Sequence, residues 1–536
     1  MAEKYRLPRA RYPEEVGVSG VEVEKFFIDI EENNINIHSF MVIRHGKVAA
    51  ECYRAPFSAD EPHALYSVSK TFTSAAVGIA VGEGIISLDD KVKDFFPEYT
   101  EKLNDKKLDM LTVRHLLTMT SGKNPSILDN KSKGHWVESF FSFPWKNAPG
   151  EEFKYVSENI FMLCAILVKA TGMSVRDYLQ PRLFEPLGID YPNWETDENG
   201  IEAGGWGLYA TTEDVAKLML CIHQKGVFNG KQIIPEDYVT EMISFQADNS
   251  QVNHNRDSKV GYGYCVWRNE AANGYRADGM FSQFGIVFED YDAIFAINAA
   301  IPMEQDCRDF IWEHFPAAFI DEDESGKKQK ASAPELKEKL DNATLDTPFE
   351  ASESPMAEFI EGRNIKFRKK IFLNLIGFPM SMLPLAVTFM STDRAGNIDD
   401  MSFVFEDDAL FMSWREGTEK NTIKAGMNGR FCYGEMTLGK VTYKVCCTAQ
   451  WLNDDRLFVS VRPIETIGKR MLDFKFNFNG RVVMSPSSDP SVETISDYLA
   501  DNVQEVTKIK PVQAVLRKII SYFPQIVEPR HYGKMK

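Results

Sequence analysis

Hydrophobic positions in the first half of the chain follow two periods, one typical of helices and one typical of strands. Residues 21–33, VEVEKFFIDIEEN, have the period of an amphipathic helix. The stretch SFMVIRHGKVAAECYR, from Ser39, predicts two strands joined at His45-Gly46. Further strands are predicted by GYGYCVWR, by YRADGMFSQFGIVFE and by DAIFAINAAI, which follow one another.

The segment between these two groups of strands has mainly helical periodicity. Helices are predicted in the apolar, small-residue stretch YSVSKTFTSAAVGIAVGEG and over 111–122, 159–172 and 214–226. Gly122 and Gly172 are expected to stop two of them, and Thr211 and Thr212 are candidate N-caps of the last. Because strands lie at both ends and helices in the middle, we expect one antiparallel sheet built from both ends, with a helical insertion.

The pattern changes after residue 319. Residues 320–356 are charged and rich in Ser, Ala and Pro, which is typical of a linker with one short helix. Short alternating runs follow, such as MSFVFEDDALFMSW and LDFKFNFNGRVVMS, and they predict a β-sandwich or barrel. The stretch KPVQAVLRKIISYFPQI near the end predicts an amphipathic helix. We therefore expect a first domain over 1–319, a linker over 320–356 and a β-rich domain over 357–536.

One long apolar segment, IFLNLIGFPMSMLPLAVTFM at 371–390, resembles a membrane span in length. It contains Asn374, Pro379 and Pro384, and strand-like residues follow it at once. Since the two prolines would break a membrane helix, we expect buried strands or a membrane-surface loop here, and no integral membrane span.

Composition narrows the possible functions. The chain has 536 residues, too many for one ordinary core, and its net charge of −17 disfavours nucleic acid as a partner. Its N-terminus lacks the apolar core of a signal peptide, and its eight cysteines are scattered, so we expect reduced thiols and a cytoplasmic location. No metal-ligand spacing, phosphate-binding loop or G-x-S-x-G elbow is visible, so no metal or cofactor is expected.

The candidate chemistry begins with Ser67 and Lys70, three residues apart in the apolar helical stretch. Residues at this spacing share a helix face, so the Lys70 amine is expected to lie beside the Ser67 hydroxyl. Burial and the helix N-terminus lower a lysine pKa, which would let Lys70 accept a proton from Ser67. The same tetrad also occurs by chance, so its context decides.

Five ordered stretches supply that context: HALYSVSKTFTSAAVG, LTVRHLLTMTSG, PGEEFKYVSENIFMLCAILVKATG, GGWGLYATTEDVAKL and YRADGMFSQFGIVF. Over about residues 10–315 the chain resembles the serine β-lactamase and penicillin-binding-protein superfamily, in the branch of class C β-lactamases, D-alanyl-D-alanine peptidases, family VIII esterases and nylon-oligomer hydrolases. The resemblance implies an α/β (α+β) domain with an antiparallel sheet flanked by helices. The later β-rich domain is similar to extensions of some of these hydrolases.

The resemblance also implies roles for particular residues. Ser67 would be the acylated nucleophile and Lys70 its proton partner, while Tyr155, as a phenolate, would be general base and then acid to the leaving group. The backbone N–H groups of Ser67 and Met280 would form the oxyanion hole. Substrate would also meet the positions of Ser157, Ala277 and Gly279, with Gly279 allowing close approach of the backbone.

Two motifs depart from the family pattern. Ser157 stands where asparagine is usual, and Asn159 could substitute only if it faced the same way. The triplet Ala277-Asp278-Gly279 lacks the lysine or histidine of relatives, which attracts a substrate carboxylate. Arg276 would point to the opposite face of the strand, by alternation. Gln283 is interpreted as structural.

We therefore expect a serine hydrolase acting on small esters or amides without a required carboxylate, of unknown oligomeric state. The alternatives are a β-lactamase or D-Ala-D-Ala peptidase, an acyltransferase, and a sensor that is acylated without turnover.

Overall fold

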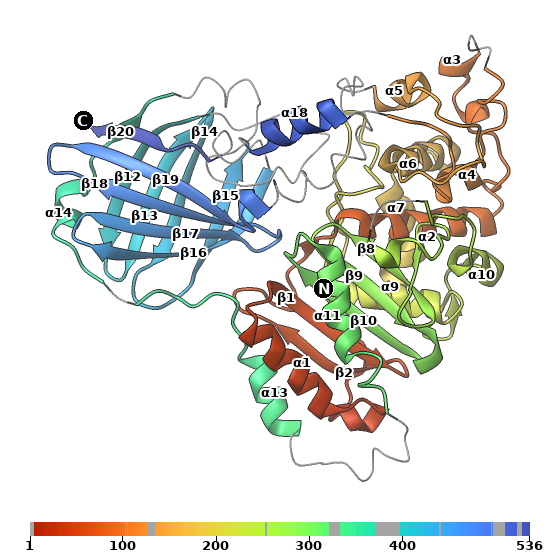
Figure 1. The fold of residues 1–536 in the computed structure, drawn as a ribbon, viewed down its shortest axis with the longest axis horizontal. Helices are drawn as coiled ribbons and strands as arrows, with labels where there is room; N and C mark the ends of the chain where they lie inside the picture. The colour runs from red at the N-terminus through yellow and green to blue at the C-terminus, as the bar shows by residue number, and fades with distance from the viewer. Residues whose placement is uncertain are drawn as a thin grey trace. The chain divides into compact units, whose positions relative to one another are not determined.

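The computed structural model describes residues 5–101, 103, 105–125, 135–251, 255–320, 333–350, 352–369, 397–438, 441–494, 496, 510–521 and 528–536. Backbone contacts divide the chain into two units (Figure 1). The N-terminal unit comprises residues 1–54 and 58–343, and the barrel unit comprises residues 55–57 and 344–536. The apolar segment 371–390 lies outside the described residues.

An antiparallel sheet of six strands forms the centre of the N-terminal unit as described, in the order β2-β1-β10-β9-β8-β7. These strands are β1 (Ile37–Arg44), β2 (Lys47–Tyr53), β7 (Trp267–Arg268), β8 (Gly274–Gly279), β9 (Gln283–Phe288) and β10 (Ala293–Ala299). The first two strands pair with each other, and β1 pairs with β10 from the far end of the unit. The prediction of one sheet built from both ends is confirmed.

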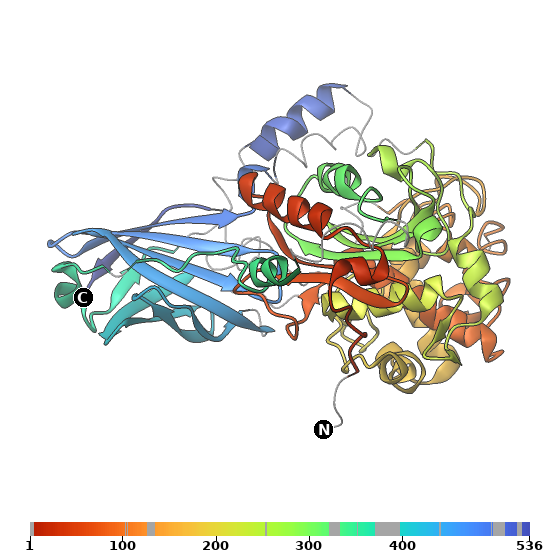
Figure 2. The same ribbon diagram turned by 90° about the horizontal axis from the view of Figure 1, so that it is seen from below.

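Helices cover both faces of this sheet (Figure 2). On one face lie α1 (Gly20–Glu32), α11 (Glu304–His314) and α13 (Ala333–Asp341). Phe26 of α1 packs against Phe40 and Phe295, which belong to adjacent strands and share a face. On the other face lies α9 (Thr212–His223), and a Cβ at Gly285 of β9 would come within 2.7 Å of Met219 of that helix. Glycine therefore lets α9 approach the sheet closely.

The inserted segment forms a helical cluster beside the sheet, as predicted. Its helices are α2 (Ser69–Gly82), α3 (Pro97–Thr100), α4 (Val113–Leu117), α5 (Trp136–Ser142), α6 (Ser157–Thr171), α7 (Val175–Leu179), α8 (Glu185–Leu187) and α10 (Glu236–Ile243). Two small ladders accompany them: β3 (His63–Ala64) with β4 (Tyr209–Ala210), and β5 (Val227–Phe228) with β6 (Lys231–Gln232). Gly172 ends α6 in the left-handed region with φ +70°, and Thr211 is the N-cap of α9. The predicted caps Gly172 and Thr211 are confirmed. The prediction that Gly122 stops the helix over 111–122 is wrong, because α4 ends at Leu117 and its C-cap is Thr118.

The barrel unit as described contains ten strands in one sheet, in the order β14-β13-β12-β11-β20-β19-β18-β17-β16-β15. Gly426 of β14 also pairs with Thr448 of β16, which closes the sheet into a barrel. The strands are β11 (Ile365–Phe367), β12 (Ile398–Glu406), β13 (Ala409–Glu416), β14 (Glu419–Gly426), β15 (Cys432–Leu438), β16 (Val441–Asn453), β17 (Arg456–Pro463), β18 (Lys469–Phe476), β19 (Arg481–Asp489) and β20 (His531–Met535). Of the two predicted all-β forms, the barrel is present.

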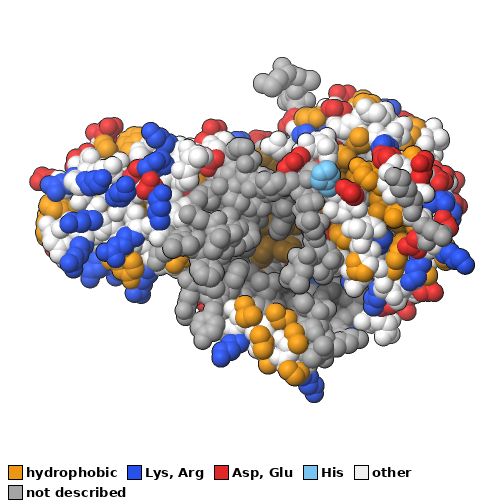
Figure 3. All heavy atoms as spheres, turned by 90° about the horizontal axis from the view of Figure 1, so that it is seen from above, with side chains coloured by type: hydrophobic (Ala, Val, Ile, Leu, Met, Phe, Trp, Pro, Cys, Tyr) orange, Lys and Arg blue, Asp and Glu red, His pale blue; other side chains and the backbone are white. Residues whose placement is uncertain are grey.

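Two short helices and one longer helix lie in or near the predicted linker and C-terminal region. Helix α13, from the predicted linker, buries Leu336 and Leu340 in the core of the N-terminal unit, and α14 (Met356–Ile360) belongs to the barrel unit. Helix α18 (Lys510–Ser521) exposes Val515 and Ile519, as an amphipathic helix does. In the space-filling view from above, Lys and Arg side chains gather on the visible face of the barrel unit (Figure 3). The acidic total charge therefore does not describe every face of the molecule.

In the described part of the chain, no single helix has the length and apolar composition of a membrane span, although α6 and the segment Val175–Leu187, which meet at a bend of 72°, pass such a test together.

Candidate active site

Ser67 lies in a short 3₁₀ turn, η2 (Tyr66–Val68), directly before α2. Tyr66 has a φ of +47°, in the left-handed region that bulky residues adopt only when the surrounding structure requires it. Tyr66 and Val68 are buried, whereas Ser67 is half-buried. The strained turn therefore presents the Ser67 hydroxyl at the surface of an otherwise buried segment.

Lys70 lies one turn further along and reaches back to this hydroxyl. Its Nζ donates hydrogen bonds to Ser67 Oγ at 2.8 Å and to the Gly205 carbonyl oxygen at 2.6 Å. The side chain is almost fully buried, and this burial lowers the pKa of Lys70 to about 7. The predicted pair is confirmed as a contact, and near neutral pH the amine is able to hold or release a proton.

Tyr155 completes the group. Its phenol is hydrogen-bonded to Ser67, and its ring centroid lies 4.8 Å from Lys70 Nζ. Burial raises the pKa of Tyr155 far above its ordinary value, and the hydrogen bond with Ser67 offsets only part of this effect. The structure thus brings a hydroxyl, an amine and a phenol together, and the raised pKa favours the neutral phenol over the phenolate that the sequence analysis expected.

Two further aromatic residues lie next to Tyr155, and the sequence analysis did not identify them as site residues. The rings of Trp267 and Tyr262 lie 5.3 Å and 6.3 Å from that of Tyr155, centroid to centroid. Both belong to GYGYCVWR, which was predicted to be a strand. That prediction is wrong for all but Trp267–Arg268, because the chain before them turns back through Gly261 and Cys265, which have positive φ values. The density of aromatic residues in the octapeptide was the available signal.

The loop that carries Gly205 is held by polar side chains of α2. Thr73 Oγ1 donates to the Gly204 carbonyl at 3.0 Å, and Ser69 Oγ accepts from Leu208 N–H at 3.2 Å. A Cβ at Gly204 would lie 2.5 Å from Cys164 Sγ of α6. The glycine pair therefore allows the loop to lie against α6 and places the Gly205 carbonyl on Lys70. The sequence signal was the pair Gly204-Gly205 itself.

Ser157 and Asn159 lie differently with respect to this site. Ser157 is the first residue of α6 and half-buried, and its Cβ would lie 3.3 Å from a Cβ at Gly205. It is therefore next to the loop that contacts Lys70. Asn159 is fully buried and donates from Nδ2 to the sulfur of Met119 at 3.6 Å. Asn159 consequently does not take the place of the asparagine that Ser157 replaces.

Strand β8 presents its residues to two faces, as alternation predicts. Arg276 Nε donates to Asp278 Oδ2 at 2.8 Å, so these two side chains share a face, and Ala277 points the other way. Arg276 is fully buried and also donates to the carbonyl oxygens of Arg268 and Asp257. It therefore does not supply a cation at the position of Ala277.

The end of β8 touches the turn that carries Ser67. A Cβ at Gly279 would lie 2.6 Å from the Leu65 carbonyl oxygen, so the close approach that requires glycine here is to this turn. The Met280 side chain is exposed, so it does not pack against this turn. Gln283 Nε2 donates to the carbonyl oxygens of Phe281 and Ala299, at 3.0 Å and 2.7 Å, and so holds the turn after Met280. The structural interpretation of Gln283 is confirmed.

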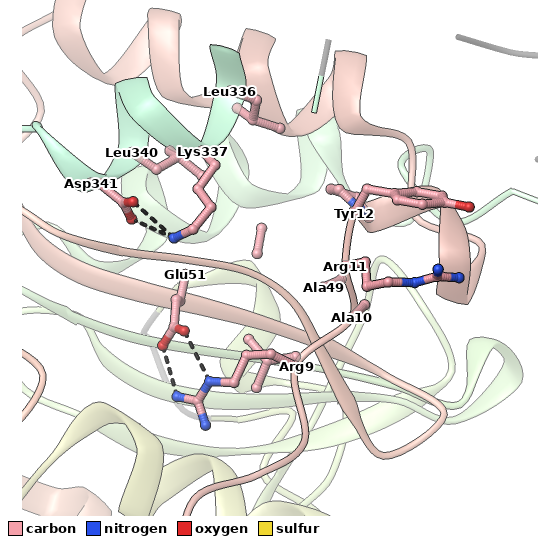
Figure 4. Close-up of a pocket in the computed structure, with 13 residues that line it drawn as sticks. Arg9, Ala10, Arg11, Tyr12, Ala49, Glu51, Leu336, Lys337, Leu340 and Asp341 are labelled. Atoms are coloured by element: carbon pink, nitrogen blue, oxygen red, sulfur yellow. Dashed lines mark hydrogen bonds and ion pairs between the residues drawn. The ribbon is translucent and has the colours of Figure 1, made fainter. Parts of the chain in front are cut away.

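A separate cavity of about 270 Å³ lies in the N-terminal unit between α13, the N-terminal segment and β2 (Figure 4). Lys337 and Asp341 of α13 pair on one side, and Arg9 and Glu51 pair on the other. None of Ser67, Lys70 and Tyr155 lines this cavity. Among the described residues, no group of three or more His, Cys, Asp or Glu side chains could hold a metal ion.

Comparison with known proteins agrees with this geometry. A family model described as Beta-lactamase matches residues 30–313. A beta-lactamase of Escherichia coli (strain K12) is 28% identical over 203 residues, 32% of this chain and 52% of that protein. A 6-aminohexanoate-dimer hydrolase of Paenarthrobacter ureafaciens is 26% identical over 223 residues, 38% of this chain and 57% of that protein. The acyltransferase mokF of Monascus pilosus is 29% identical over 168 residues, 26% of this chain and 40% of that protein. The chain thus spans about half the length of the first two curated relatives.

Proposed function

The chain belongs to the beta-lactamase family, and from this membership we propose that it is a serine hydrolase that forms an acyl-enzyme on Ser67. The observation that carries the proposal is the Ser67 hydroxyl, which is hydrogen-bonded to both Lys70 Nζ and the Tyr155 phenol. A hydroxyl between an amine with a lowered pKa and a neutral phenol has a proton acceptor and a proton donor at once.

The pKa values favour one assignment of proton-transfer roles. Burial lowers the pKa of Lys70 to about 7 and raises that of Tyr155, so the neutral amine is the better base and the phenol the better acid. This reverses the expectation from the sequence, in which a Tyr155 phenolate was the base.

In the acylation step, Lys70 takes the proton of Ser67 Oγ while Oγ bonds to the substrate carbonyl carbon. The negative charge that develops on the carbonyl oxygen is stabilised by the backbone N–H groups of Ser67 and Met280, each worth about 3 kcal/mol. The bond to the leaving group then breaks as Tyr155 gives its proton to the leaving atom, and the Lys70 ammonium returns a proton to Tyr155. Water repeats the sequence on the acyl-enzyme, and Ser67 leaves with its proton restored.

The proposed substrates are small esters or amides without a required carboxylate. Ala277 is small and buried, at the position where the resemblance places the lysine or histidine of other family members. Arg276 lies on the opposite face of β8, with Asp278. A substrate carboxylate would therefore find no charged partner on the Ala277 face of β8. The same acyl-enzyme would serve an acyltransferase if an alcohol or amine replaced water, and one relative is named as an acyltransferase.

Covalent labelling and turnover together test the proposal. The full chain is treated with a fluorophosphonate probe and with p-nitrophenyl esters, an amide, a lactam and a D-Ala-D-Ala peptide. We expect labelling and ester turnover, both abolished in Ser67→Ala and both kept in Ser250→Ala, a change at an exposed serine. Labelling without turnover of any substrate would indicate a sensor. Turnover that persists in Ser67→Ala would remove the proposed nucleophile.

A further inference from the structure

A buried cluster of charges lies behind the candidate active site, and one carboxylate in it has an exposed edge. Asp278 Oδ2 accepts hydrogen bonds from Arg276 Nε at 2.8 Å and from Arg308 Nη1 at 3.0 Å. The side chains of Arg276 and Arg308 are 0% and 1% exposed, whereas that of Asp278 is 15% exposed. Solvent therefore reaches this cluster through Asp278 and not through the arginines.

A second carboxylate in the cluster has no such exposure. Asp257 is fully buried and lies 3.4 Å from Arg308 Nε, with further hydrogen bonds from Gln305 Nε2 and Trp312 Nε1, both at 2.9 Å. Asp257 and Asp278 together balance the two arginines. Loss of Asp278 would thus leave one guanidinium charge without its carboxylate partner. Of these four residues, Asp278 is the one that solvent reaches, so the uncompensated charge would lie at the solvent-accessible side of the cluster.

Two observations connect Asp278 with the reaction centre, and from them we infer that its exposed edge faces the entrance to that centre. The next residue is Gly279, which touches the turn carrying Ser67. The charge of Asp278 also acts on the Lys70 ammonium and on the Tyr155 phenol. An anionic group that entered beside the scissile bond at this entrance would meet a carboxylate that already occupies the arginine donors.

We propose that Asp278 is an internal carboxylate that occupies the Arg276–Arg308 pair and thereby excludes substrates with a carboxylate next to the scissile bond. The inference rests on the proposed function and names its substrate class: acyl groups that are neutral or cationic on the side that faces the end of β8. Selectivity against carboxylated substrates would then have two causes: the carboxylate of Asp278, and the absence of a lysine or histidine at position 277. Without Asp278, the two guanidinium groups retain N–H donors whose geometry suits a carboxylate.

The test compares two esters that differ only in charge: mono-p-nitrophenyl succinate and its methyl ester. We expect the parent chain to prefer the methyl ester in kcat/KM by about 10²-fold, and Asp278→Ser to shift that ratio toward the free acid by at least about tenfold. Asp257→Asn is the matched control. It also removes a carboxylate charge that pairs with Arg308, but at a position closed to solvent. Its ratio is expected to stay with the parent.

Glu304 is a further carboxyl close to Asp278, and burial together with the charge of Asp278 raises its pKa to about 7. Since loss of Asp278 would favour its ionisation, the double variant Asp278→Ser/Glu304→Gln is measured beside the single one. We expect an equal or larger shift of the ratio in the double variant. Asp278→Ala, which also removes the acceptor from both arginines, carries the same expectation if the serine variant does not fold.

A second readout does not depend on turnover. Sodium acetate, compared with sodium chloride at equal ionic strength, is expected to raise the Tm of Asp278→Ser by about 2–4 °C and to leave the parent and Asp257→Asn unchanged. An unchanged ester ratio in folded, probe-labelled Asp278→Ser, or an equal shift in Asp257→Asn, overturns the inference. Absence of Ser67 labelling in the parent is a failure of the proposed function instead, and the acetate experiment still decides on the carboxylate site.

Discussion

Two cationic sites of this chain, the Asp346 cluster of the barrel unit and Lys70 of the N-terminal unit, have different surroundings. In the barrel unit Arg462 and Lys469 both donate to the carboxylate of Asp346. In the N-terminal unit Lys70 donates to a hydroxyl and to the Gly205 carbonyl. Burial alone would raise the pKa of Asp346, but its two cations outweigh that effect and hold it below its usual range, whereas burial lowers the pKa of Lys70 to about 7. The Asp346 cluster thus holds its carboxylate in the charged state, whereas burial disfavours the protonated state of Lys70.

Positive φ values at non-glycine residues are also distributed unequally between the described parts of the two units. Tyr66, Cys265, Phe281 and Ser282 have positive φ values, and all four lie in segments that form or hold the Ser67 site. In the described part of the barrel unit the non-glycine residue with a positive φ is Asp407, in the hairpin turn between β12 and β13. In the N-terminal unit positive φ values also occur at Asn34, His45, Met119, Lys225, Asn229 and Asp292. Left-handed backbone is therefore present at the proposed site, but it does not by itself mark that site.

The largest expected effect comes from removing the amine. Lys70→Met should lower kcat/KM by about 10³-fold, because Ser67 loses its proton acceptor. Stability should not fall with it. The pKa of Lys70 is lower in the folded chain, about 7, than its ordinary value of 10.5, so burying the protonated amine costs stability in full below pH 7, and this cost disappears as the pH rises to 10.5. At pH 6 the Tm of the variant should equal or exceed that of the parent.

Lys123 is the matched control for this experiment. It is also buried, burial lowers its pKa to about 8, and its Nζ donates to the carbonyl oxygens of Phe141 and Phe143. Lys123→Met should keep ester turnover, because this amine contacts no nucleophile. Equal losses of ester turnover in both variants would show that the loss does not depend on contact between the lysine and Ser67. The special role assigned to Lys70 in the comparison with the barrel would then be wrong.

The second effect is on stability and belongs to the barrel. Asp346→Ala should lower the unfolding free energy of the barrel unit by about 3–5 kcal/mol, because Arg462 stays buried and keeps only the longer contact with Asp489, at 4.0 Å. Probe labelling of Ser67 should stay normal at temperatures where the chain is folded. Calorimetry with chemical denaturation measures the change.

Asp473→Ala provides the comparison on the same barrel. Its partner Arg456 is 41% exposed, so the loss should be under about 1 kcal/mol. A loss in Asp346→Ala no larger than this would mean that the buried cluster does not stabilise the barrel.

The sequence predicted what periodicity and family motifs encode, and missed what long-range packing decides. The alternation of the C-terminal strands, the caps Thr211 and Gly172, and the contact of Ser67 with Lys70 all follow from spacing along the chain. The Gly205 carbonyl and the Trp267 ring come from loops whose course depends on α2 and α6, and no periodicity records that. The direction of proton transfer depends on burial, which sequence shows only on average.

The third expected effect is on the pH dependence of acylation. If neutral Lys70 is the base, kcat/KM for a neutral ester should fall tenfold per pH unit below about 7 and reach a plateau above it. The raised pKa of Tyr155 keeps the acid protonated, so no alkaline decline is expected below pH 10. Glu304 is the competing group, since its pKa is also raised to about 7. Glu304→Gln should leave the inflection in place; an inflection that vanishes with Glu304 would assign the titration to that carboxyl and not to Lys70.

The smallest expected effect tests whether stability and activity can be separated within the N-terminal unit itself. Thr211 Oγ1 accepts from Asp214 N–H at 3.1 Å, and Asp214 Oδ2 accepts from Thr211 N–H at 3.1 Å, which together form the capping box of α9. Thr211→Ala should lower the unfolding free energy by about 1 kcal/mol, and Thr211→Ser should recover most of it, because a serine hydroxyl can accept the same bond. Since α9 supports the sheet from the face opposite α1 and contributes no group to Ser67, ester turnover should be unchanged in both variants at 25 °C. A fall in turnover in Thr211→Ala that Thr211→Ser restores would mean that the stability of α9 determines the geometry of the Ser67 site. Stability and activity would then not be separable in the N-terminal unit, and the contrast with the barrel unit would no longer hold.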